Sequence, residues 1–211
     1  MQYFFIAPDT ILYLLDMIGV VACAAAATLL AQHKGFDIFG CILVSMVNGF
    51  GGGTVRDLLL DRHPMFWMTD LNYVIVITIT SLILQMFFHI YHKIDKAVKL
   101  FDAIGLATFS VIGFKVALAQ GALPLIAVLM GVCTAIVGGM TRDIICNEIP
   151  LVLQKEIYIT ASILGACVYL ILDWVGVHTG FNDFIMLSII FIIRMFAVTF
   201  DWHLPSIRLI K

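Results

Sequence analysis

One short phrase occurs twice in this 211-residue chain, 86 residues apart. Two glycines, two further residues, an arginine and an aspartate stand at 52–57 and again at 138–143. The same offset pairs other residues without a gap: Asp16 with Asp102, Gly19 with Gly105, Gly35 with Gly121, and Pro64 with Pro150. Such a register indicates an internal duplication, so the chain is expected to build two copies of one structural unit.

The solvent for this duplicated unit is predicted to be lipid. Hydrophobic residues make up 62% of the chain and charged residues 12%, with a mean hydropathy of +1.07, far from the composition of a soluble domain. The net charge is only -2 and the twelve cations are dispersed, which argues against nucleic acid as a partner. The N-terminus lacks the basic region of a secretory signal, so the first apolar segment is interpreted as a retained span.

Seven apolar segments approach the roughly 20 residues that a bilayer requires of a helix. We place them at about 11–31, 38–61, 71–91, 102–120, 122–147, 156–173 and 183–200. The predicted fold is therefore an all-α polytopic membrane protein, with residues 1–211 forming a single transmembrane domain.

The distribution of the cations predicts how these spans are oriented in the membrane. One side of a seven-span chain carries most of them, namely Lys34, Lys93, Lys96, Lys99, Lys155, Arg208 and Lys211, whereas the other has essentially Arg62. By the positive-inside rule the lysine-rich side is cytoplasmic, with the N-terminus outside and the C-terminus inside. The repeat distance contains three crossings, and because this number is odd, the second copy enters the membrane from the opposite face. We therefore predict a first repeat at 11–91, an inverted second repeat at 98–173, and an additional seventh helix at 183–200.

The glycines are expected to break the second and fifth helices. Gly51, Gly52 and Gly53 are consecutive, and Gly138 and Gly139 are adjacent; glycine disfavours a helical interior by about 1 kcal/mol relative to alanine. Backbone opened at membrane depth is tolerated where it lines a watery cavity, and its carbonyls can replace part of a cation's water shell. The alternative is that the glycines only allow close helix packing.

Charged residues follow both glycine sites directly. Arg56 is adjacent to Asp57, and Arg142 to Asp143, so on a helix their side chains diverge by about 100° and each is expected to need another partner. We predict two symmetry-related ion pairs, one between Asp16 and Arg56 and one between Asp102 and Arg142. These pairs serve either as structural locks or in gating and permeation.

Lys115 is a further cation within an apolar run. It either snorkels to the membrane interface or faces the cavity, where it would act as an electrostatic gate for cations.

Other chemistries find no support in the sequence. The five cysteines are scattered singly without metal-ligand spacing. The histidines fall near span ends, and although His89 and His92 have helical i, i+3 spacing, no carboxylate or cysteine completes a metal site with them. Since no nucleophile, base and orienting residue come together either, we expect no catalytic residues, no metal site and no cofactor.

The doubled motif and the layout of three, three and one spans resemble the prokaryotic branch of the trimeric intracellular cation channel family, over roughly 12–200. The resemblance implies a homotrimer in a bacterial inner membrane, with a pore in each protomer that conducts potassium and, less selectively, sodium. It assigns Gly52, Gly53, Gly138 and Gly139 to helix kinks. Sequences of this kind are also described as bacterial glycine-uptake transporters. The Lys-Glu-Val motif of animal members is missing, since Val116 and Ala117 follow Lys115.

Three functions therefore follow from the sequence. The first is a passive potassium channel with a pore walled by the first, second, fourth and fifth spans. The second is a carrier of a small zwitterion such as glycine, whose carboxylate would sit at half-helix N-termini near Thr54 and Met140. The third is a structural or assembly protein in which the glycines are only packing devices.

Overall fold

The protein is all-helical. The computed structural model describes residues 10–87, 94–154, 157–177 and 179–202. Within these residues it contains eight α-helices and one 3-10 helix: α1 (Thr10–His33), α2 (Ile38–Leu59), α3 (Phe66–Thr69), α4 (Asn72–Met86), α5 (Ile94–Ala119), α6 (Pro124–Ile145), the 3-10 helix Leu151–Leu153, α7 (Ile159–Trp174) and α8 (Thr179–Phe200).

Seven of these helices coincide with the predicted segments, and the differences lie at their ends. Helix α5 begins at Ile94, two turns earlier than expected, and the short helix α3 was not predicted. Five helices, α1, α2, α5, α6 and α8, are long and apolar enough to cross a membrane, whereas α4 and α7 are apolar but only 15 and 16 residues long. Helix length and composition thus identify five spans rather than the expected seven.

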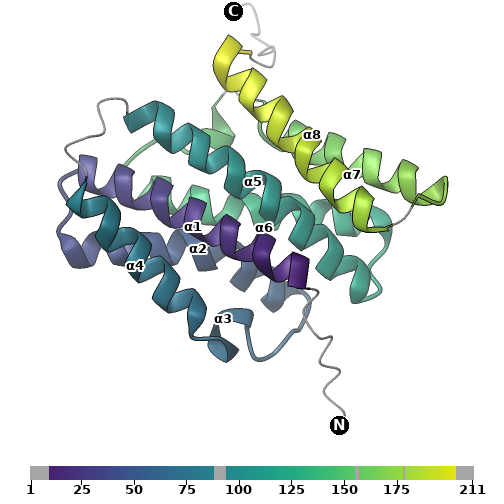
Figure 1. Cartoon of the computed structure of the whole chain (residues 1–211), viewed down its shortest axis with the longest axis horizontal. Helices are drawn as coiled ribbons and strands as arrows, with labels where there is room; N and C mark the ends of the chain where they lie inside the picture. The colour runs from purple at the N-terminus through teal and green to yellow at the C-terminus, as the bar shows by residue number, and fades with distance from the viewer. Residues whose placement is uncertain (1–9, 88–93, 155–156, 178, 203–211) are drawn as a thin grey trace, which may run out of the picture.

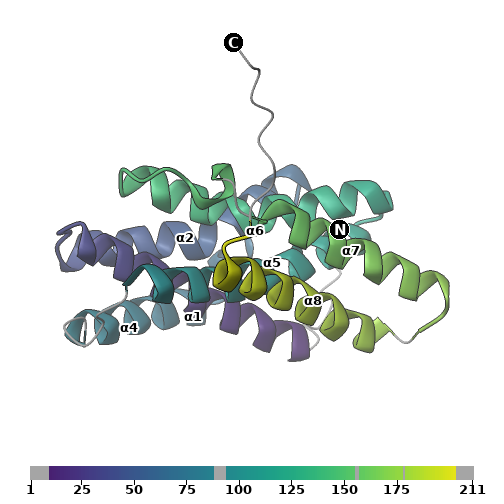
Figure 2. The ribbon, with the colours of Figure 1, turned by 90° about the horizontal axis from the view of Figure 1, so that it is seen from above.

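The helices form two layers. Figure 1 shows α4, α1, α5 and α8 side by side in the nearer layer, and Figure 2 shows α2 and α6 together in the other, with α7 at the edge beside α8. At the centre, α1 packs against α5 and α2 packs against α6. Each central helix therefore contacts the helix that lies 86 residues away in the repeat.

Helices end at equivalent positions in the two copies. Gly35 after α1 and Gly121 after α5 have φ of 81° and 80°, a left-handed conformation that costs glycine little. The next amides, of Phe36 and Ala122, donate to carbonyls five residues back, as in a Schellman cap. Asp61 after α2 and Asn147 after α6 repeat this pattern with φ of 51° and 55°.

Small residues bring α1 and α5 close together. Alanines 22 and 24–27 of α1 are all buried. A Cβ at Gly19 would overlap Thr108 of α5, and one at Gly105 would meet the Cys23 sulfur of α1 at 2.7 Å. Close approach at small residues is the usual basis of helix packing in lipid, and it explains why Gly19 and Gly105 recur in register.

The predicted breaks at the glycines are wrong. Helix α2 continues as α-helix through Gly51, Gly52 and Gly53, and α6 continues through Gly138 and Gly139. The backbone does not open there, and Gly52 and Gly138 instead face another helix at very short range.

Candidate functional site

The glycines of the two copies meet where α2 crosses α6. A methyl group on Gly52 would overlap the main-chain carbonyl oxygen of Thr134, and one on Gly138 would overlap that of Asn48. Asn48 and Thr134 lie 86 residues apart, so the two contacts are equivalent. A Cβ at Gly51 would lie 3.3 Å from the Gly138 Cα atom. In this structure the crossing is a close contact between two backbones.

The remaining glycines of the motif have different surroundings. A side chain on Gly53 would overlap the Phe66 ring of α3. At Gly139 a Cβ would lie 3.5 Å from Asp102 Oδ1 and 3.8 Å from Arg142 Nη2, which is ordinary contact. Gly53 therefore leaves room for the segment that follows α2, whereas Gly139 lies beside the charged residues of the second copy.

Each arginine of the motif binds the aspartate next to it, contrary to the expectation that the two side chains diverge. Arg56 Nε donates to Asp57 Oδ1 at 2.8 Å, and Arg142 Nε donates to Asp143 Oδ1 at 2.8 Å. The flexible arginine side chain spans the angle between neighbouring positions. All four residues are at most 4% exposed, and at such depth pairing of opposite charges is required.

The second oxygen of each aspartate fastens the chain that follows the helix. Asp57 Oδ2 accepts the backbone amide of Phe66 at 3.1 Å, and Asp143 Oδ2 accepts that of Leu151 at 3.0 Å. These amides begin α3 and the 3-10 helix, so each carboxylate satisfies an otherwise unpaired donor. The arginine-aspartate pair thus ties each loop back to the end of its own helix.

The two predicted interhelical ion pairs have different outcomes. Arg142 Nη1 lies 3.1 Å from Asp102 Oδ1, so this pair joins α6 to α5. The Asp16–Arg56 pair is not among the ion pairs of the described residues. Asp16 instead accepts the hydroxyl of Tyr73 from α4, and the Arg56 guanidinium lies 5.5 Å from the centre of the Phe66 ring.

Several buried polar residues of the interior were missed from the sequence. Asn48 donates from Nδ2 to the Cys23 carbonyl at 2.7 Å, while its Oδ1 accepts no hydrogen bond from any described residue. Thr28 joins Ser45 and Ser81 in a hydroxyl chain across α1, α2 and α4. Isolated polar residues in apolar helices were the available signal, since each requires a buried partner.

Lys115 contacts α8. Its ammonium forms an ion pair with Asp183, whose side chain is 8% exposed, and this partner was also missed from the sequence. The pair places the Lys115 ammonium beside α8, so its role as a gate between the central helices stays a prediction.

Replacing Lys115 with Gln separates a structural role of this pair from gating. We expect K115Q and D183N each to lower stability by about 1–3 kcal/mol, because each removes the opposite charge from a largely buried group, and the K115Q/D183N double variant to recover part of the loss. Thermal unfolding of the four proteins in detergent measures this coupling. Strictly additive losses of stability in the double variant would contradict the coupling between Lys115 and Asp183. Unchanged conductance and open probability in K115Q would exclude a role of Lys115 as a gate.

Comparison with known proteins identifies the family. The family model described as "Glycine transporter" matches the chain at residues 13–89 and again at 99–174, with starts 86 residues apart. The inner membrane protein YadS of Escherichia coli K12, named as a UPF0126 protein, is 35% identical over 201 residues, covering 94% of this chain and 97% of that protein. A UPF0126 membrane protein of Vibrio cholerae is 37% identical over 211 residues, covering 97% and 87%.

The fold is also known from a solved structure. The crystal structure of the trimeric intracellular cation channel (TRIC) orthologue from Rhodobacter sphaeroides aligns with a TM-score of 0.88 and 36% identity, over 92% of this chain and 100% of that one. The chain is therefore an integral membrane protein that belongs to the UPF0126 family, whose model is described as a glycine transporter, and it has the fold of the prokaryotic TRIC channels.

Proposed function

We propose that this protein is a monovalent cation channel, selective for potassium, with a route for ions inside each protomer between α1, α2, α5 and α6. The observation that carries this proposal is the similarity to the Rhodobacter sphaeroides cation channel orthologue, which extends over all of that chain at 36% identity. The proposal includes a homotrimer, in keeping with the trimeric description of that orthologue.

The α2–α6 crossing supplies one oxygen ligand for such a route. The Asn48 Oδ1 atom lies at the crossing beside Gly138 and accepts no hydrogen bond from any described residue, and an oxygen dipole of this kind can replace part of the hydration shell of a cation. The backbone contact at Gly52 and Gly138 closes the crossing, so conduction requires α2 and α6 to move apart. Glycine at both positions supplies a surface on which the two helices can separate and meet again.

The proposed topology has seven crossings. Helices α1, α2 and α4 form one repeat, α5, α6 and α7 form the inverted second repeat, and α8 is the additional helix. Support comes from the packing of α1 on α5 and of α2 on α6, and from helix ends that recur 86 residues apart. Lys34, Lys96 and Lys99 then lie on the cytoplasmic side of a bacterial inner membrane, the N-terminus outside and the C-terminus inside.

A glycine carrier is the second candidate, favoured by the description of the family model. Its expected binding sites were half-helix N-termini near Thr54 and Met140. Both residues lie inside continuous helices, so neither offers the free backbone amides that hold a carboxylate. Because the binding site expected for a carrier has no free amides in this structure, the channel is our first candidate.

Planar-bilayer recording of the purified protein in asymmetric potassium chloride tests the proposal. We expect unitary current steps without glycine that reverse near the potassium equilibrium potential, smaller steps in sodium chloride, and no steps in protein-free bilayers prepared with the same detergent. Saturable uptake of labelled glycine into proteoliposomes, with no unitary steps, would instead establish the carrier.

A further inference from the structure

Asn48 lies at the centre of the α2–α6 crossing and has an unused hydrogen-bond acceptor. It stands midway along the 22 residues of α2 and is only 2% exposed. Its Nδ2 atom donates to the Cys23 carbonyl of α1 at 2.7 Å, whereas its Oδ1 atom accepts no hydrogen bond from any described residue. A buried amide oxygen without a donor costs free energy, so this atom indicates a partner that the closed crossing does not supply.

The hydrogen bond to α1 fixes which end of the Asn48 amide faces α6. The amide is planar, with Nδ2 and Oδ1 on opposite sides of Cγ, so an Nδ2 atom held on the Cys23 carbonyl directs Oδ1 away from α1. A Cβ at Gly138 of α6 would lie 3.2 Å from Oδ1, which places this oxygen against a residue without a side chain. Separation of α2 from α6 would therefore uncover the acceptor and leave the donor on α1.

The equivalent residue of the second copy, Thr134, presents a different group to the crossing. Its hydroxyl donates to the Met130 carbonyl of its own helix at 2.7 Å and lies against Gly113 of α5, where a Cβ would overlap it. The atoms of Thr134 nearest to a Cβ at Gly52 of α2 belong to its backbone. The two copies thus differ, and Asn48 is the one that turns a side-chain oxygen to the crossing.

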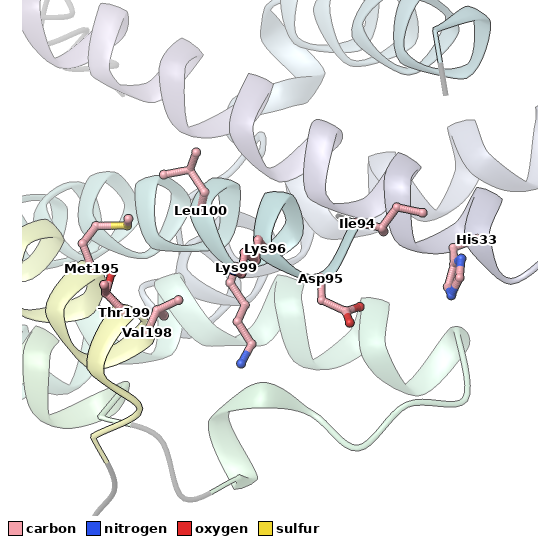
Figure 3. Close-up of a pocket in the computed structure, with 9 residues that line it drawn as sticks. All are labelled: His33, Ile94, Asp95, Lys96, Lys99, Leu100, Met195, Val198 and Thr199. Carbon is pink, nitrogen blue, oxygen red and sulfur yellow. The ribbon is translucent and has the colours of Figure 1, made fainter. Parts of the chain in front are cut away.

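Positive charge near the crossing is compensated. Both arginines of the repeated motif are paired with aspartates, and Lys115 is paired with Asp183 beside α8. Lys96 and Lys99 line a cavity of about 850 Å³ (Figure 3), whose residues come from α1, α5 and α8 and not from α2 or α6. In these surroundings an electronegative oxygen at the crossing favours the passage of a cation over that of an anion.

We propose that Asn48 makes the channel prefer cations to anions, because its Oδ1 atom coordinates a partly dehydrated monovalent cation once α2 and α6 have moved apart. An anion would need the Nδ2 donor, which the Cys23 carbonyl holds on the opposite side of the amide. The inference rests on the proposed channel function and names a residue that determines its selectivity.

Reversal potentials in asymmetric potassium chloride test the proposal in the full-length protein, because they report the permeability ratio of potassium to chloride. Wild type should give cation-selective unitary currents. N48L keeps a side chain of similar size and removes the oxygen, so the ratio should fall about tenfold, the factor expected for losing one contact between a polar group and a charge. N48T gives the first copy the residue of the second and should also lower the ratio.

T134V is the matched control, because it changes the equivalent position to a residue of similar shape and removes a hydroxyl that faces α5 rather than α2. Its permeability ratio should equal that of wild type. Size-exclusion chromatography and thermal unfolding establish that each variant is folded, and N48T provides the measurement if N48L does not fold.

The outcomes separate this inference from the channel function on which it rests. Wild-type protein without unitary currents would remove the channel function and the inference with it. Cation-selective currents in wild type, with an unchanged permeability ratio in folded N48L or N48T, would overturn the inference alone. An equal fall of the ratio in T134V would overturn it as well, because the effect would then come from packing at the crossing and not from the Asn48 oxygen.

Discussion

Gly52→Ala is expected to prevent normal accumulation of the folded protein or to lower its midpoint of thermal unfolding by about 10 °C. The added methyl group would occupy the position of the Thr134 carbonyl oxygen, and neither backbone can move without separating α2 from α6. Overpacking of this kind costs about 3 kcal/mol, which corresponds to roughly 10 °C for a chain of this size. Size-exclusion chromatography after heating, with circular dichroism, measures the loss.

The second copy of the repeat offers an equivalent substitution to Gly52→Ala, and a glycine outside the crossing offers a control. Gly138→Ala should reproduce the defect, because its methyl group would overlap the Asn48 carbonyl in the equivalent contact. Gly180→Ala should unfold at or slightly above the wild-type temperature, because a side chain there meets no atom within 4 Å and alanine favours helix. Wild-type stability in both G52A and G138A would show that the close crossing is not the state of the protein in the membrane.

The helices could be predicted from the sequence because a long apolar segment in lipid has to satisfy its backbone internally. The recurrence of Gly35 and Gly121 was visible in the sequence, but only the structure links it to equivalent helix ends, where both residues have positive φ. The meaning of Gly52 and Gly138 could not be read in the same way. A glycine that opens a helix and a glycine that admits another backbone have the same local sequence, and only the position of the Thr134 and Asn48 carbonyls distinguishes them.

For the charged residues too, the sequence predicted some partners and not others. Asp102 and Arg142 were paired from their positions in the repeat, and the structure brings them to 3.1 Å. Asp16, the equivalent of Asp102, binds Tyr73 instead, and Asp183 pairs with Lys115 from a helix outside the repeat. Symmetry predicts which positions correspond, but side-chain partners depend on neighbours that the duplication does not specify, such as Tyr73 and α8.

Arg142→Ala is expected to have the second large effect, a loss of about 3–5 kcal/mol of stability. Arg142 is 1% exposed and binds both Asp102 and Asp143, so its removal leaves two buried carboxylates without this cation. Breaking a buried pair from one side has a cost of this size. The loop anchored by Asp143 on the Leu151 amide should loosen as well, which limited proteolysis of this segment would detect.

Arg56→Ala is the matched comparison, because it changes the equivalent residue of the first copy. Asp57 keeps a second cation, Arg62, at 3.1 Å, so we expect a smaller loss of about 1–2 kcal/mol for breaking the hydrogen bonds to a charged group. Combining Arg142→Gln with Asp102→Asn should recover part of the stability lost in Arg142→Gln alone, since one buried charge is removed with its partner. Thermal unfolding in one detergent compares all these variants. Equal losses of stability in R142A and R56A would contradict this explanation, because it attributes the larger loss in R142A to the two carboxylates that Arg142 neutralises.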